Sequence, residues 1–140
     1  MDQVIYELKN PFEYARKGEQ EKSQFIELTA PSFKQLQYHS PIEQAFAQAV
    51  GEIAETVSES DGGDAGELTG GAVLQVLLRW SGDVNKVYIA AQELFKQIAK
   101  IDGETRLTVP LMEKMHVDDY KALVGEYIAN FIVPSLMDGT

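Results

Sequence analysis

Two histidines and a pair of adjacent aspartates are the side chains best suited by type to catalysis or metal binding. His39 and His116 stand far apart in the sequence, and neither has a second metal ligand at helical spacing, as an HExxH motif would supply. Asp118 and Asp119 are neighbours, and neighbouring helical residues diverge by about 100°, so their carboxylates would not share one site. We therefore expect these residues to lie at helix boundaries as capping or solvated groups.

Motifs that would indicate an enzyme or a metal site are absent or incomplete in the sequence. It contains no GxSxG, GxxxxGKS/T or GxGxxG pattern and no cysteine. The acidic stretch 61–67 is an incomplete calcium loop, because Gly63 and Ala65 occupy positions where an EF-hand places oxygen ligands. The sequence predicts no enzyme, no metal and no cofactor, with carboxylates from distant segments as the remaining route to catalysis.

The charge balance narrows the classes of partner. The chain has 140 residues, 22 acidic and 12 basic, for a net charge of −10. A nucleic-acid or anionic-membrane partner would require cationic side chains, so both are disfavoured. No stretch approaches the ~18 apolar residues of a membrane span, and the first residues lack the features of a secretory signal. We expect a cytoplasmic protein.

Acidic residues are concentrated between Lys34 and Arg79, where the sequence has no basic residue. We expect a flexible acidic loop over 59–69. Two interpretations stay open: a solvated surface, or a docking surface for a basic partner that orders the segment on binding. The acidic element comprises Glu52, Glu55, Glu59, Asp61, Asp64 and Glu67.

Aromatic residues crowd the polar N-terminal third of the chain. Residues 3–8 and 23–28 are rich in strand-forming types and predict an antiparallel hairpin with a long polar connection. The rings either pack this hairpin onto a helical core or stay exposed for self-association or a client protein. The candidates for that interaction surface are Phe12, Tyr14, Phe25 and Phe33.

Helical periodicity dominates the rest of the sequence. A short helix over 32–38 would turn Phe33 and Leu36 inward, and a capping box at 40–43 would begin the next helix. Residues 72–80 predict a buried central helix that Thr69-Gly70-Gly71 can start, with a buried strand as the competing interpretation. Further helices are expected over 84–101, with Asp83 as a good N-cap, and from Asp118 or Asp119 to Phe131, with an uncertain segment at 104–116.

The fold class expected is therefore mainly α (α+β): an N-terminal β-hairpin followed by a bundle of four to five helices. We expect a single domain over 1–140, with a hairpin segment at 1–31 and a helical core at 32–140.

The N-terminal segment resembles the signature of phage tail assembly chaperones. The resemblance rests on YELKNPF at 6–12, Gly18, and FIELTAPS at 25–32. In that family a strand ends in a proline followed by an aromatic or aliphatic residue. A glycine-containing loop and a second strand come next, and then a proline and an amphipathic helix. The last helix also resembles the family's closing helix, so the similarity covers 3–38 and 117–137.

The resemblance implies a small α-rich chaperone made in the host cytoplasm and absent from the mature virion. Such proteins bind the long, apolar, helical tape measure protein and keep it soluble until tail tube subunits polymerise around it. Many of the genes also yield a longer, frameshifted product whose extra domain recruits tail tube protein, and this chain corresponds to the short product. Covering an extended client requires many copies, so a homo-oligomer is expected.

The alternative from another functional class is an acidic helical adaptor or decoy that occupies a basic protein surface. It predicts salt-sensitive binding to a basic protein and a monomer or compact dimer.

Overall fold

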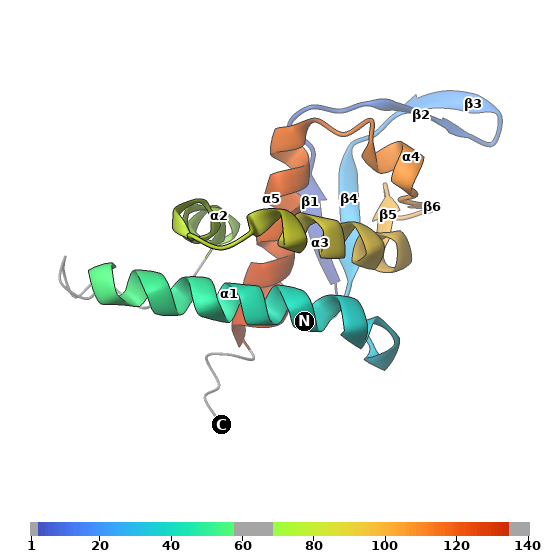
Figure 1. Ribbon diagram of the computed structural model, residues 1–140. Coiled ribbons are helices and arrows are strands. Elements are labelled where there is room, and N and C mark those ends of the chain that lie inside the picture. Colours follow the sequence, from blue (N-terminus) through green and yellow to red (C-terminus); the bar gives the residue numbers. More distant parts are fainter. Residues whose placement is uncertain (1–2, 58–68, 135–140) are drawn as a thin grey trace.

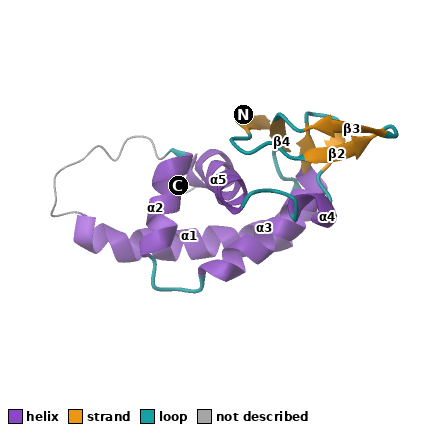
Figure 2. Ribbon diagram, turned by 90° about the horizontal axis from the view of Figure 1, so that it is seen from above, coloured by secondary structure: helices purple, strands orange, loops and turns teal. Residues whose placement is uncertain are grey.

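The strands of the protein gather on one side of the molecule and most helices on the other (Figures 1 and 2). The structure, a computed structural model, describes residues 3–57 and 69–134. It is a mainly helical α+β fold in which paired N-terminal strands precede the helices, as the sequence predicts. The strands are β1 (Gln3–Glu7), β2 (Glu13–Arg16), β3 (Glu19–Lys22), β4 (Phe25–Thr29), β5 (Ala99–Ile101) and β6 (Thr105–Arg106). The helices are η1 (Phe33–Gln35), α1 (Leu36–Val57), α2 (Gly70–Arg79), α3 (Val84–Ile98), α4 (Val109–Met112), α5 (Val117–Tyr127) and η2 (Ile128–Ile132).

Four strands form one antiparallel sheet in the order β1-β4-β5-β6. The expected antiparallel pairing of the two N-terminal strands is confirmed by β1 and β4. β5 and β6, which follow α3 in the sequence, extend the same sheet. Ile26 of β4 lies opposite Ile101 of β5. The segments 1–31 and 32–140 therefore share one sheet.

Two tight hairpins occupy positions where the sequence analysis expected a loop and a helix end. β2 and β3 form a separate ribbon that closes at Lys17 (φ 52°) and Gly18 (φ 84°). β5 and β6 close at Asp102 (φ 54°) and Gly103 (φ 77°). Positive φ at both central residues is typical of the type I′ turn, whose twist suits paired strands and favours glycine. At Lys17-Gly18 the turn forms a hairpin in spite of the polar composition around it. At Asp102-Gly103 the turn forms a hairpin in spite of the helical spacing of the apolar residues before it.

Helices α2 and α3 begin where the sequence predicts. Thr69 and Asp83 cap them, each accepting a hydrogen bond from a backbone N–H of the first turn. The expected helix end at Ile101 is wrong, because β5 takes that residue into the sheet. The expectation that α2 is buried all round is also wrong, since Leu78 is 64% exposed.

Helix α1 runs without a break through Pro41, so the expected new start at 40–43 is wrong. The capping box lies earlier. Ser32 Oγ accepts a hydrogen bond from the backbone N–H of Lys34, and Gln35 Oε1 accepts one from the Ser32 N–H at 2.7 Å. The free energy lost with the one backbone hydrogen bond that proline cannot make is small compared with the stabilisation that α1 gains by burying its apolar stripe.

His116 caps α5 by accepting a hydrogen bond at Nδ1 from the backbone N–H of Asp118 at 3.0 Å. The capping role expected at His116 is therefore confirmed, and the one expected at Asp118 or Asp119 is wrong. His39 lies inside α1, and its ring is half-buried against the core. His39 is thus a packed residue within a helix.

The core lies between one face of the sheet and the helices that cover it. α1 and α3 pack alongside each other, and α2 packs on α5 (Figure 1). A Cβ on Gly125 of α5 would lie 2.6 Å from the carbonyl oxygen of Gly70 on α2, so glycine permits this close approach. The largest fully buried side chains include Tyr14, Tyr127, Phe46, Phe95, Ile26 and Leu28.

Candidate interaction surface

Phe33 is 88% exposed, more than any other large apolar side chain in the described part of the chain. Leu36, one turn further on and 48% exposed, adds to the same end of α1. The expectation that both point inward is wrong, because Gln35 takes the buried position and donates a hydrogen bond to Gln97 Oε1 of α3 at 3.0 Å. Phe33 therefore has the exposure that an interaction residue needs.

The other three aromatic candidates lie around the β5–β6 turn and are less accessible. Tyr14 is fully buried, which corrects the expectation of an exposed ring there. Phe12 is half-buried, and its ring centroid lies 6.4 Å from that of Tyr14. Phe25 is half-buried, with its ring beside Gly103. The four rings do not form one continuous exposed surface, because Tyr14 is fully buried.

The buried position of Tyr14 follows from Asp102, whose carboxylate joins the two hairpins. Asp102 Oδ2 accepts a hydrogen bond from Tyr14 Oη at 2.8 Å. Its Oδ1 accepts hydrogen bonds from the backbone N–H groups of Gln24 at 2.8 Å and Phe25 at 3.1 Å. Burial raises the pKa of Tyr14, and the hydrogen bond to Asp102 adds to the increase. This arrangement indicates a structural role for Tyr14.

Asp119, at the start of α5, holds the end of β1 in a similar way. Its carboxylate accepts hydrogen bonds from Tyr6 Oη at 2.7 Å and from the backbone N–H groups of Lys9 and Asn10 at 3.1 and 2.8 Å. Burial alone would raise the pKa of Asp119, but the hydrogen bonds together outweigh it and leave that pKa below its ordinary value. The sequence analysis missed this role. The available signal was the four-residue spacing from Asp119 to buried Leu123 on the inner face of α5.

His39 links α1 to α5 in the core. Its Nδ1 lies 2.6 Å from Tyr127 Oη, and the two rings meet edge to face. Glu43, one turn along α1, places a carboxylate oxygen 3.8 Å from His39 Nε2. Burial raises the pKa of Tyr127, and the charge of Glu43 raises it further. These contacts stabilise a helix crossing.

Of the predicted acidic element, only the Glu52 side chain lies within the described part. It accepts hydrogen bonds from the backbone N–H of Ser81 at 3.3 Å and from Ser81 Oγ at 2.9 Å. Glu52 therefore connects α1 to the link between α2 and α3. The Glu55 side chain and Glu59, Asp61, Asp64 and Glu67 lie outside the described residues, as does the loop 59–69 up to its last residue.

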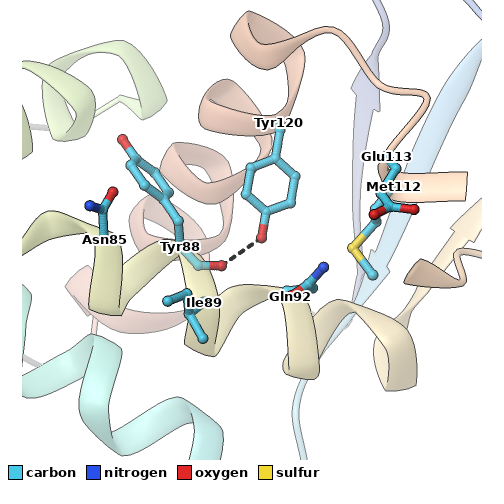
Figure 3. A pocket seen from close by; sticks show the side chains of 7 residues that line it. All are labelled: Asn85, Tyr88, Ile89, Gln92, Met112, Glu113 and Tyr120. Carbon is cyan, nitrogen blue, oxygen red and sulfur yellow. Dashed lines mark hydrogen bonds between the residues drawn. The ribbon is translucent and has the colours of Figure 1, made fainter. Parts of the chain in front are cut away.

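An open groove of about 420 Å³ lies between α3, α4 and α5 (Figure 3). Ile89 of α3 is 64% exposed at this groove, and Met112 contributes its thioether from α4. Tyr120 Oη donates a hydrogen bond to the backbone oxygen of Tyr88 at 2.7 Å, and burial raises the pKa of both tyrosines. The groove can accommodate an apolar side chain. Its lining is Asn85, Tyr88, Ile89, Gln92, Met112, Glu113 and Tyr120.

Over 3–57 and 69–134, no three His, Asp or Glu side chains gather closely enough to hold a metal ion. Within the same ranges, no helix combines the length and the apolar character needed to cross a bilayer.

Comparison of the chain with protein-family models, curated proteins and solved structures gives no match.

Proposed function

We propose that this protein is a phage tail assembly chaperone that binds the tape measure protein and keeps it soluble in the host cytoplasm during tail tube assembly. The observation that carries the proposal is the exposed ring of Phe33, which lies in η1, after the paired N-terminal strands and immediately before the long helix α1. A holdase needs apolar surface that stays accessible on a folded, charged body, and this position supplies it.

The order of the N-terminal elements supports the proposal. β1 is followed by the pair Pro11-Phe12, β4 by Pro31, and α1 is amphipathic with a buried apolar stripe. Each element of the tail-chaperone signature thus falls on an observed strand, connection or helix. Because the signature is short, this agreement supports the family and gives no detail of the client.

The surface chemistry suits a helical, apolar client. A client helix presents apolar side chains at three- and four-residue steps. Phe33 and Leu36 offer a ring and an aliphatic chain at one end of the molecule, and the groove beside Ile89 offers a recess for an apolar side chain. A net charge of −10 keeps a chaperone with such exposed groups in solution.

The proposal extends to the other partners of such chaperones. A longer, frameshifted form recruits tail tube protein. Neither form remains in the mature virion.

Co-expression with the tape measure protein of the same phage tests the proposal. We expect the soluble fraction of the tape measure protein to rise when the chaperone is present. Phe33→Ser should reduce that gain, because it removes the exposed ring. Leu78→Ser is the matched control, since it removes a 64% exposed apolar side chain from α2 instead.

An unchanged soluble fraction in the presence of the wild-type chain would contradict the proposal. If Phe33→Ser and Leu78→Ser reduce the gain equally, chaperoning stands but the Phe33 site is wrong. Circular dichroism of both variants checks that each remains folded.

A further inference from the structure

The outer edge of β1 carries backbone groups that no strand pairs within the residues 3–57 and 69–134. β1 is the first strand of the order β1-β4-β5-β6, so β4 occupies only one of its two sides. The backbone N–H of Leu8 donates to the oxygen of Gln24 at 3.0 Å, which fixes the alternation of hydrogen bonds along the pair. Residues 4, 6 and 8 therefore point their backbone groups at β4, and Gln3, Ile5 and Glu7 point theirs outward. We call these outward groups the open edge.

The open edge lacks the protection that other edges of the molecule have. β2 and β3 carry charged side chains along the ribbon, and β6 is only two residues long with Arg106 at its end. β1 spans five residues, and Ile5, its middle residue, is 55% exposed. Glu7 is the one charged side chain of β1, fewer than β2 or β3 carries, and edges with few charged residues are the ones to which another strand adds.

We propose that the open edge pairs antiparallel with the open edge of a second copy of this chain, about a two-fold axis at Ile5. In this register Ile5 faces Ile5 of the other copy, and Gln3 faces Glu7. Each of these pairs exchanges both backbone hydrogen bonds, because all the residues involved point outward in both copies.

The side chains of β1 suit this register. The Gln3 amide is placed to donate to the Glu7 carboxylate of the other copy, so neither carboxylate faces a like charge. On the same face the exposed Ile5 side chains cover each other at the axis. The pairing joins two four-stranded sheets into one continuous sheet. It does not depend on what client the protein binds.

Cysteine cross-linking tests the register, since the chain has no cysteine of its own. Hydrogen-bonded residues of antiparallel strands have Cα atoms about 5.5 Å apart, within the range that a disulfide spans. Under mild oxidation we expect Ile5→Cys to form a covalent dimer. A mixture of Gln3→Cys and Glu7→Cys chains should form the mixed dimer. Gln3→Cys alone should not cross-link, and neither should Ile89→Cys, a control on α3 that is more exposed than Ile5.

Ile5→Pro tests the backbone pairing. Proline at this position removes an outward N–H and leaves the hydrogen bonds to β4 in place. By symmetry the dimer loses two hydrogen bonds, so we expect its dissociation constant in sedimentation to rise at least about tenfold. Ile5→Thr, which keeps the N–H, should weaken the dimer less. Circular dichroism and thermal unfolding check that both variants keep the fold.

A wild-type chain that remains a monomer at all concentrations would overturn the proposal. So would Gln3→Cys chains that cross-link to themselves as readily as Ile5→Cys chains, because that result requires another register. A dimer that survives Ile5→Pro unchanged would place the interface elsewhere. None of these outcomes bears on solubilisation of a tape measure protein, so failure here is distinct from failure of the proposed function.

Discussion

Two carboxylates, Asp102 and Asp119, fix the N-terminal third of the chain to the rest. Each accepts hydrogen bonds from one tyrosine hydroxyl and two backbone N–H groups. Among the described residues, every buried side-chain nitrogen or oxygen has a hydrogen-bond partner. Asp119, one of the two adjacent aspartates considered for catalysis, is therefore a structural acceptor, because an orphaned buried N–H costs more than a buried, fully bonded carboxylate.

We expect Asp119→Asn to lower the free energy of unfolding by about 3 kcal/mol at neutral pH, because three hydrogen bonds lose their charged acceptor. Urea unfolding measures the loss. Asp118→Asn is the matched control, since its side chain is exposed. Equal effects of the two substitutions would contradict a specific role for Asp119.

The stability that Asp119 contributes should depend on pH. Hydrogen bonding holds the pKa of Asp119 in the folded chain below the ordinary value of 3.8. Its contribution is therefore fully present above pH 3.8 and is lost as the pH falls through the lower, folded-state pKa. The Asp119→Asn chain should lose less stability over that acid range, as measured by urea unfolding at a series of pH values. An identical acid profile for both chains would contradict this linkage.

The buried tyrosines should make the fold sensitive to alkali. Burial raises the pKa values of Tyr6, Tyr14, Tyr88, Tyr120 and Tyr127 above 10.0. The unfolded chain releases these protons more readily, so stability is present below pH 10 and declines as the pH rises beyond it. We expect tyrosinate absorbance and the loss of circular dichroism to change together. Ionisation of most tyrosines near pH 10 with the fold intact would contradict this.

At the scale of elements, the sequence predicted what local patterns determine. The pairing of the two N-terminal strands and the caps at Thr69 and Asp83 follow from residue types at short spacing. The hairpin at Asp102-Gly103 had a sequence signal too, because Asp-Gly favours a type I′ turn. The helical stripe that runs up to Ile101 obscured that signal. The apolar residue Ile101 fits the helical spacing of that stripe, but it fits a buried position in a strand equally well.

The crossing of α2 and α5 depends on a residue without a side chain. We expect Gly125→Ala to destabilise the protein by about 1–3 kcal/mol, because the new Cβ would press on the carbonyl oxygen of Gly70. Gly51→Ala in α1 is the control: no atom lies within 4 Å of its added Cβ, and alanine favours a helix by about 1 kcal/mol. Thermal unfolding should shift in opposite directions for the two variants. A neutral Gly125→Ala would show that the helices separate at no cost.

At the scale of the whole molecule, long-range contacts set what the sequence left open. The burial of Gln35 and the burial of Tyr14 each depend on a partner far along the chain, which is Gln97 for Gln35 and Asp102 for Tyr14. For the four predicted aromatic residues, the sequence therefore did not determine which of the rings remain accessible.

The net charge of −10 should make stability rise with salt, because screening relieves repulsion within the folded chain. Exposed ion pairs such as Lys96–Glu93 oppose this only weakly. We expect a gain of about 1 kcal/mol in the free energy of unfolding between low salt and about 0.2 M sodium chloride. Urea, which adds no ions, is the denaturant, and the fluorescence of the single tryptophan, Trp80, is the signal. Glu113→Lys lowers the net negative charge and should show a smaller gain. A decrease in stability with salt would mean that ion pairs outweigh the repulsion.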